Sequence, residues 1–324
     1  MLLSFYSIDT WYLQLPKQNQ LLYSMNNHCE RLLKKTKLSM LLPKLFEIPR
    51  PVIDGKSPII ISGNLLQLGE VHMLPVVQGL EPRMDPETKI KMYAALGGAS
   101  ILNKLLNTNP KDYEKFIWTP CQEMSLWIGT VNYDDSLEDL LNVFVKTRFG
   151  SAAVERNTTM RELVTLSEIL KLYREHKITS KLRTEDVGSD MISIPSNQDL
   201  MEAVRLMFRN RVRRVFLKSS THRNDNLEFV SDRDIIRFLF SPDRLEIAKK
   251  SPELWTNAKL SELDSNMAHL IADEKTINQA SLEIGDRIGD CLVCNKSSKV
   301  VSRWDIVVKP FVQGHYELST EDWE

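Results

Sequence analysis

One pattern of predicted strands and helices recurs four times along this chain of 324 residues. In its clearest copy, Met191 to Pro195 is a predicted strand, and Val212 to Lys218 and Leu227 to Val230 are two more. The apolar residues between the first two strands have the spacing of one buried helix face: Leu200, Ala203, Val204, Met207 and Phe208. Ser196 is the predicted N-cap of that helix, and Ser231 opens a second helix. The unit is therefore predicted to be β-α-β-β-α.

Three other segments repeat this order at an even distance. The closing helices of the four units are predicted to open at residues 97, 165, 231 and 302, which are 68, 66 and 71 residues apart. The first copy has a predicted helix from Ser57 and Pro58 and strands Val71–Val77 and Met92–Leu96. The second has strand Ile128–Val131, a helix capped by Ser136 and Asp139, and strands Phe149–Glu155 and Glu162–Val164. The fourth has helix Thr276–Ile284 and strands Cys291–Cys294 and Lys299–Val301. Such regular spacing predicts four copies of one structural unit.

Glycine is scarce, with 12 residues among 324, and the few glycines exclude two kinds of nucleotide site. No G-x-G-x-x-G sequence is present, so a dinucleotide-binding fingerprint is excluded. Gly55-Lys56-Ser57 resembles the end of a phosphate-binding loop, but Arg50 stands where that loop needs its first glycine. The formal net charge of −1 argues against a surface that binds nucleic acid throughout.

Neither the cysteines nor the histidines form a recognisable catalytic or metal site. Four cysteines are too few for a disulfide scaffold of this size, which favours a cytoplasmic protein. Cys291 and Cys294 have C-x-x-C spacing, but residues three apart on a strand face opposite sides, so we expect buried core cysteines. The six histidines form no H-E-x-x-H sequence and no close pair. No acid–base pair or activated nucleophile is apparent, so no enzyme, cofactor or metal is predicted.

The third unit resembles a domain of the cystathionine-β-synthase (CBS) family. The resemblance is carried by Asn210 to Leu217 (NRVRRVFL) and by Phe229 to Ile236 (FVSDRDII). Members of this family pack in tandem pairs, called Bateman modules, and commonly bind adenine nucleotides or other adenosyl ligands between the repeats. Four copies in one chain are similar to the architecture of the γ regulatory subunit of AMP-activated protein kinase.

The resemblance covers residues 46–312 and implies an α+β fold of four CBS-type β-α-β-β-α repeats packed as two tandem pairs. The predicted divisions are an N-terminal extension at 1–45, a first pair at 46–177 (repeats 46–110 and 118–177), a second pair at 178–312 (repeats 178–243 and 255–312) and an acidic tail at 313–324.

Both ends lie outside the predicted repeats. In the extension, six Lys and Arg residues outnumber two acidic residues, and leucines punctuate the basic stretch, so an amphipathic helix is predicted. Docking to a membrane or a partner is one interpretation, and a helix that covers the protein itself is the favoured one. The acidic tail is predicted to be solvated. No run of roughly 18 apolar residues predicts a membrane span, and the N-terminus meets Asp9 too early for a good signal peptide.

The family's ligand signature is a Ser or Thr followed three residues later by Asp, where a strand meets the closing helix. The resemblance implies that the hydroxyl and nearby amides face a phosphate, and that the carboxylate accepts hydrogen bonds from the ribose hydroxyls. Two of the four junctions carry the full signature, Ser231/Asp234 and Ser302/Asp305. Thr165/Glu168 keeps the same chemistry on a longer side chain, which departs from the family's ribose geometry. The fourth, Gly97/Ser100, lacks the carboxylate. S-x-x-D is also a helix capping box that needs no nucleotide, but its recurrence at one junction favours binding.

Family members often place His or Arg just before the core of the second strand, where the side chain can reach a phosphate. Arg213 and Arg214 take this position in the third repeat and His72 in the first. The second and fourth repeats have Gly150-Ser151 and Gly289-Asp290 instead. This alternation predicts that the first repeat pairs with the second and the third with the fourth, with one well-equipped site per pair. The alternatives are a solvated basic edge for the arginines and a half-buried core position for the histidine.

The predicted function is therefore regulatory sensing, for example of cellular energy state. The expected ligand is AMP, ADP, ATP or S-adenosylmethionine. A protein partner is expected to respond to the ligand-bound state. The resemblance to the family also implies that the protein can form a homodimer. The first alternative is a scaffold for protein–protein interaction whose ligand sites are vestigial. The second is a nucleic-acid-binding module that uses Arg209 to Arg214 and the basic extension, against which the near-zero net charge argues.

Overall fold

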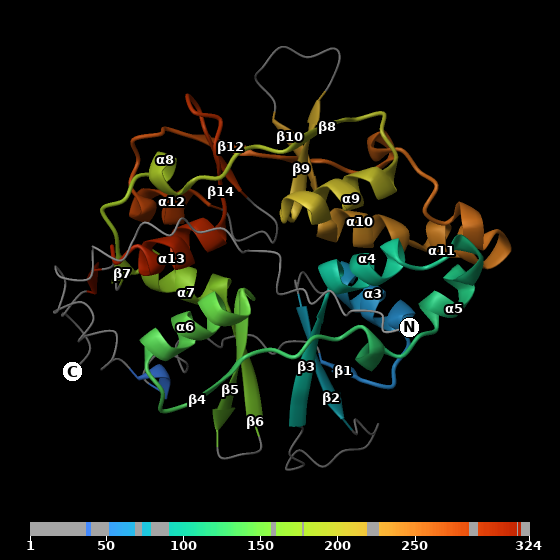
Figure 1. Ribbon diagram of the computed structural model, residues 1–324, viewed down its shortest axis with the longest axis horizontal. Coiled ribbons are helices and arrows are strands. Elements are labelled where there is room, and N and C mark those ends of the chain that lie inside the picture. The colour runs from blue at the N-terminus through green and yellow to red at the C-terminus, as the bar shows by residue number, and fades with distance from the viewer. Residues whose placement is uncertain are drawn as a thin grey trace, which may run out of the picture.

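The four repeats surround the centre of the molecule, each with a small sheet and helices beside it (Figure 1). The computed structural model describes residues 37–39, 52–68, 73–78, 91–156, 160–176, 178–218, 227–284, 291–315 and 317–318, and the fold is given for these residues. Repeats 1 and 2 occupy the lower half of Figure 1, and repeats 3 and 4 occupy the upper half.

Repeat 3 consists of the five predicted elements. They are β8 (Ser193–Pro195), α9 (Leu200–Asn210), β9 (Arg214–Lys218), β10 (Glu228–Ser231) and α10 (Asp232–Leu239). β8 pairs with β9 in parallel, and β9 pairs with β10 antiparallel. A parallel pair needs a crossover connection, which α9 supplies. The buried residues of α9 join the same core as Val215 and Val230 of the sheet.

The other three repeats have the same order of elements, which confirms the predicted α+β fold of four repeats. Repeat 1 contains β1 (Ile53–Asp54), α3 (Ile59–Leu68), β2 (Met73–Gln78), β3 (Lys91–Gly97) and α4 (Gly98–Leu106). Repeat 2 contains β4 (Thr130–Asn132), α6 (Leu137–Thr147), β5 (Ser151–Arg156), β6 (Met160–Thr165) and α7 (Leu166–Arg174). Repeat 4 contains β12 (His269–Ile271), α12 (Ile277–Glu283), β13 (Leu292–Cys294), β14 (Val300–Val301) and α13 (Arg303–Val312).

Each repeat is preceded by a segment that crosses to its neighbour. These lead-in segments are residues 37–39, 118–126, 180–190 and 256–267. Each forms an isolated β-bridge at the start of the neighbour's opening helix: Lys37 with Ser136, Pro120 with Pro58, Arg183 with Thr276, and Lys259 with Asp199. The exchange is reciprocal, so it joins repeat 1 to repeat 2 and repeat 3 to repeat 4.

The sheets within each pair also pack against one another. One apolar cluster joins repeats 1 and 2: Val77, Met92, Ala95, Ile128, Ala153 and Leu163. In the other pair, Phe216 and Phe229 pack on Cys291 and Val293. Cys291 thus faces this sheet contact, whereas Cys294 lies in a different core cluster, and both are buried. The predicted opposite orientation and burial of the two cysteines are confirmed.

The two pairs meet through their helices. α10 packs on α3 and α4 of repeat 1, and α13 packs on α7 of repeat 2 (Figure 1). Trp255 is buried in the first of these contacts, where its Nε1 donates to the carbonyl of Leu239 over 2.7 Å. Its ring meets Tyr113, on α5 (Tyr113–Ile117), edge-on with 5.6 Å between ring centroids. The contact buries apolar surface from both pairs, which stabilises their arrangement.

Ser196 is not the N-cap of α9, so that prediction is wrong. The helix begins at Leu200, and Asp199 is its N-cap. The lead-in segment of repeat 4 holds the preceding turn, because the N–H of Leu200 donates to the carbonyl of Ala258 and the N–H of Ser261 donates to the carbonyl of Ser196, each over 2.9 Å. These main-chain bonds satisfy the helix start without the predicted Ser196 cap.

Parts of both chain ends belong to the fold. Leu38, within the predicted extension, is fully buried in the core of repeats 2 and 4, and its N–H donates to the carbonyl of Asp135 over 2.8 Å. This contact agrees with a segment that covers the protein itself. The rest of the extension, residues 1–36 and 40–45, on which most of the predicted amphipathic helix falls, lies outside the described part. Within the predicted acidic tail, Gly314 and His315 are exposed, and β15 (Glu317–Leu318) pairs with β7 (Ile178–Thr179) through main-chain hydrogen bonds. Within the described ranges, no helix combines the length and apolar character of a membrane span.

Candidate functional site

The predicted Ser/Thr–acid pairs lie at strand-to-helix junctions and form capping boxes. In repeat 3, Asp234 Oδ2 accepts hydrogen bonds from the N–H of Ser231 over 2.8 Å and from its hydroxyl over 2.6 Å. The Ser231 hydroxyl accepts from the N–H of Asp234 over 3.4 Å. These bonds satisfy donors that the start of a helix leaves unpaired. The box predicted for Ser136 and Asp139 at the start of α6 is confirmed.

A residue from repeat 4's lead-in segment completes the surroundings of Asp234. Asn266 lies on β11 (Asn266–Met267), which pairs antiparallel with β10. Its Nδ2 donates to Asp234 Oδ2 over 2.7 Å. Asp234 is still only half-buried. The junction between repeats 3 and 4 therefore offers a partly exposed carboxylate whose hydrogen-bond donors are uncharged.

In repeat 4 the equivalent carboxylate is enclosed. Asp305 Oδ2 accepts from the N–H of Ser302 over 2.8 Å and from its hydroxyl over 2.6 Å, while Asp305 Oδ1 lies 2.7 Å from Lys309 Nζ. The same ammonium group donates to the carbonyl of Val187 and to the hydroxyl of Ser189, in the lead-in segment of repeat 3. Asp305 is 5% exposed, and its carboxylate is already paired with the Lys309 side chain of the same helix.

Repeats 2 and 1 also bury the corresponding positions. The N–H and the hydroxyl of Thr165 donate to Glu168 Oε2 over 2.7 and 2.5 Å, so the longer acid still closes the box. Glu168 is 7% exposed. In repeat 1, Gly97 is the N-cap without a side-chain hydrogen bond, and Ser100 is buried. Of the four junctions, repeat 3 therefore has the most accessible acid.

The two arginines predicted to reach a phosphate contact other groups in repeat 3. Arg213 donates through Nε and Nη2 to Asp232 Oδ2, over 2.9 and 2.7 Å. The guanidinium carbon of Arg214 lies 5.8 Å from the centre of the Phe229 ring. Arg214 stands opposite Ser231 in the sheet register, so the structure brings both arginines to the junction of the third repeat.

The remaining predicted site residues are spread over other junctions. Ser302/Asp305 and Thr165/Glu168 lie at the start of α13 and of α7, each in its own repeat. His72, Gly289 and Asp290 lie outside the described residues. Across the part of the chain that the structure describes, no group of three or more His, Cys, Asp and Glu side chains is placed to hold a metal ion.

Comparison with known families decides what repeat 3 is. The model of the CBS domain family matches residues 185–241, which include Ser231, Asp234, Arg213 and Arg214. Residues 185–241 form a CBS domain. No curated protein matches the sequence.

One solved structure extends the likeness from repeat 3 to the fold of most of the chain. Protein MJ1225 from Methanocaldococcus jannaschii, proposed to be an archaeal homologue of g-AMPK, is 15% identical, and the match covers 82% of this chain and 98% of that chain with a TM-score of 0.66. An uncharacterized conserved protein from Pyrococcus horikoshii is 12% identical over 73% of this chain and 89% of its own (TM-score 0.44). The CBS domain of a bacterial CNNM/CorC family Mg2+ transporter in complex with ATP is 14% identical over 44% and 91% (TM-score 0.34). The first match shows that this chain has the tandem CBS fold.

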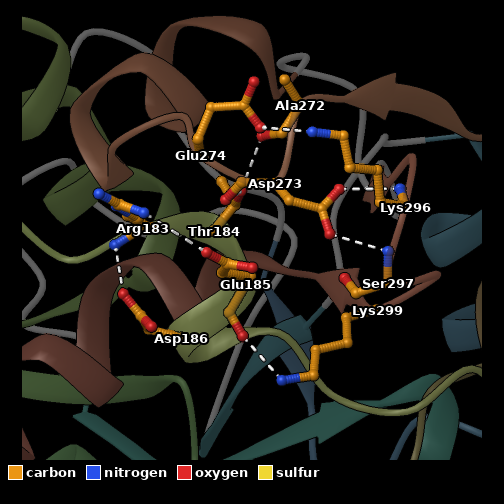
Figure 2. A network of polar contacts seen from close by, with 10 residues as sticks. All are labelled: Arg183, Thr184, Glu185, Asp186, Ala272, Asp273, Glu274, Lys296, Ser297 and Lys299. Carbon is orange, nitrogen blue, oxygen red and sulfur yellow. Dashed lines mark hydrogen bonds and ion pairs between the residues drawn. The ribbon is translucent and has the colours of Figure 1, made fainter.

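The CBS domain of repeat 3 begins at α8 (Thr184–Val187), which is anchored on repeat 4 by a polar network (Figure 2). The buried hydroxyl of Thr184 lies within hydrogen-bond distance of the carbonyls of Ala272 (3.0 Å) and Asp273 (2.8 Å). Lys299 Nζ donates to the carbonyl of Glu185 over 2.8 Å. These bonds fix the lead-in segment that also carries Ser189 to the Asp305 junction.

Asp273 holds the turn of repeat 4 on which α8 rests. Its carboxylate accepts hydrogen bonds from the N–H groups of Lys296 (2.9 Å) and Ser297 (2.8 Å), as Figure 2 shows. Burial alone raises the pKa of Asp273, but hydrogen bonds from Ser297 and Lys296 outweigh burial and hold the pKa below its ordinary value. The carboxylate is therefore a structural anion of the CBS pair.

Three residues that shape these junctions were not predicted from the sequence. Asn266 reaches Asp234 only because β11 pairs with β10, and no local pattern announces that pairing. Lys309 could have been found, because it lies four residues after Asp305 on one helix, the spacing of an ion pair. Asp232 directly follows Ser231, but only the structure shows that it binds Arg213.

Proposed function

We propose that this protein is a non-enzymatic, cytoplasmic regulator that binds an adenosyl ligand at the junction of repeats 3 and 4. AMP, ADP, ATP and S-adenosylmethionine are the candidate ligands. The main support for this proposal is the position of Asp234. It is half-buried at the start of α10, where it is hydrogen-bonded to Ser231 of repeat 3 and to Asn266 from the lead-in segment of repeat 4. Adenosyl ligands are what CBS domains commonly bind, and these residues lie within or beside the matched domain.

The chemistry of this junction suits a ribose. An ionised carboxylate accepts strong hydrogen bonds from vicinal hydroxyls, and each such bond contributes about 1.5–3 kcal/mol. Asn266 and the Ser231 hydroxyl can exchange their bonds to Asp234 for bonds to a ligand. Ser302/Asp305 and Thr165/Glu168 are secondary sites in this proposal, because their acids are almost fully buried and the former already binds Lys309.

Regulation follows from where α10 lies. Its N-terminus carries the proposed ligand site, and the helix packs on α3 and α4 of repeat 1. A ligand that shifts α10 therefore changes the contact between the two tandem pairs, and a partner protein reads that change. Coupling of this kind amounts to about 1–3 kcal/mol.

Calorimetric titration of the full chain with AMP, ADP, ATP, adenosine and S-adenosylmethionine tests the proposal. We expect micromolar binding of at least one ligand and its loss in Asp234→Ala. Absence of heat with all five ligands, supported by absence of any shift in thermal midpoint, would overturn it.

A scaffold for protein–protein interaction is the second candidate. Trp118, which is 58% exposed, favours it, because tryptophan side chains are common at the centre of protein–protein contacts. In that case the capping boxes only stabilise helices, and a homodimer or a protein partner covers Trp118.

A further inference from the structure

Asp232 and Arg213 form a close ion pair beside the proposed ligand site. Both Nε and Nη2 of Arg213 point at one oxygen of Asp232, at 2.9 and 2.7 Å. The Asp232 side chain is 7% exposed and the Arg213 side chain 38%. The two residues are also joined by a main-chain hydrogen bond, in which the N–H of Asp232 donates to the carbonyl of Arg213 over 2.9 Å.

Asp232 is buried because repeat 1 covers it. A Cβ atom placed on Gly98, the first residue of α4, would lie 3.9 Å from Asp232 Oδ2 and 3.7 Å from its carbonyl oxygen. The start of α4 thus lies against the start of α10, beside the carboxylate of Asp232. Withdrawing Arg213 from it would leave a buried charge uncompensated, which is strongly unfavourable.

This pairing changes what Arg213 can do for a ligand. A phosphate that approaches Arg213 also approaches the carboxylate of Asp232, so attraction to one charge is offset by repulsion from the other. The guanidinium group of Arg214, on β9, lies over the ring of Phe229 on the neighbouring strand β10. A chain of phosphates therefore gains little from Arg213, whereas the proposed ribose contacts of Asp234 do not depend on the number of phosphates.

We propose that Asp232 is a specificity-determining residue that makes the repeat 3 site favour an adenosine-type ligand with at most one phosphate over di- and triphosphates. This inference rests on the proposed function of the same site. It names Asp232 as a residue that acts through Arg213 and not as a direct ligand contact.

The test is calorimetric titration of wild-type protein, Asp232→Asn and Asp199→Asn with adenosine, AMP and ATP at constant ionic strength. Asp199 is the control, because it is also an aspartate at the start of a helix of repeat 3 that pairs with a cation. It is the N-cap of α9, and its carboxylate lies 2.6 Å from Lys259 Nζ, away from the proposed site at the start of α10. Wild type and Asp199→Asn should both bind adenosine and AMP more tightly than ATP. In Asp232→Asn the affinity for ATP should rise roughly tenfold while that for adenosine stays within about twofold.

The outcomes separate this inference from the proposed function. If wild type binds ATP as tightly as adenosine or more tightly, or if Asp232→Asn leaves the ratio of ATP affinity to adenosine affinity unchanged, the role of Asp232 is refuted although the ligand site stands. If no adenosine-type ligand binds any of the three proteins, the proposed function itself fails. Matching circular dichroism spectra of the variants establish that a lost signal does not come from unfolding.

Discussion

Lys309 Nζ lies 2.7 Å from Asp305 Oδ1, at the junction where repeat 4 would otherwise present a free carboxylate. The ammonium also binds Val187 and Ser189 of the crossing lead-in segment. We expect Lys309→Met to lower the free energy of unfolding by about 2–3 kcal/mol, because the buried Asp305 loses its cation. Urea denaturation measures this change. Lys249→Met removes an exposed pair with Glu246 and should cost less than about 1 kcal/mol; equal losses would contradict the role of Lys309.

Thr184 ties α8 to repeat 4 through its buried hydroxyl. Thr184→Val keeps the shape of the side chain but leaves the carbonyls of Ala272 and Asp273 without this donor. We expect a loss of about 1–2 kcal/mol of unfolding free energy. Thr108→Val, at the surface end of α4, removes a comparable bond to the carbonyl of Lys104 and serves as the control. A loss at Thr184 no larger than at Thr108 would show that the network of Figure 2 is not a structural anchor.

Leu38 tests whether the first lead-in segment belongs to the folded protein. It is fully buried among residues of repeats 2 and 4. Leu38→Ala should cost about 2–4 kcal/mol, because it opens a cavity in that core. Leu282→Ala, at a site 57% exposed on α12, should change stability by less than about 1 kcal/mol. Urea denaturation measures both changes, and an unchanged denaturation midpoint for Leu38→Ala would mean that residues 37–39 do not pack as described.

Asp273 gives the stability of the fold a predictable dependence on pH. Its pKa is lower in the folded protein than in the unfolded chain, so its stabilising effect is fully present above the unfolded value of about 3.9 and is lost as pH falls through the folded value. The difference in unfolding free energy between wild type and Asp273→Asn should therefore be constant from pH 7 to 5 and shrink below about pH 4. Urea titrations at several pH values measure it, with the exposed Asp264→Asn as control. A difference that grows as pH falls would contradict this account.

The repeated elements could be predicted because their signals are local. The apolar spacing of Leu200 to Phe208 and the Ser231–Asp234 box are contained within a few residues, and the structure has the helices there. The pairing of strands within one repeat followed from their order. The short strands β1 and β12 were missed, since two and three residues carry too little pattern.

The surroundings of the site could not be predicted, because the lead-in segments exchange between repeats. Ser196 failed as a cap since main-chain bonds from residues about 60 positions later hold that turn. Asn266 meets Asp234 for the same reason. The arginines illustrate a further limit: a sequence shows that Arg213 can reach the junction, but only packing against α4 explains why Asp232 is buried there and binds it.

Asp234 is proposed to bind a ligand in addition to capping a helix, and a comparison with Asp139 separates these two roles. Both residues form the same box, but Asp139 caps an opening helix, where no ligand is proposed. Calorimetric titration with AMP and adenosine, together with urea denaturation, should be done on Asp234→Ala and Asp139→Ala. Each variant should lose about 1 kcal/mol of stability, and only Asp234→Ala should lose ligand binding. Equal binding by both variants, or binding by neither variant nor the wild type, would contradict the account.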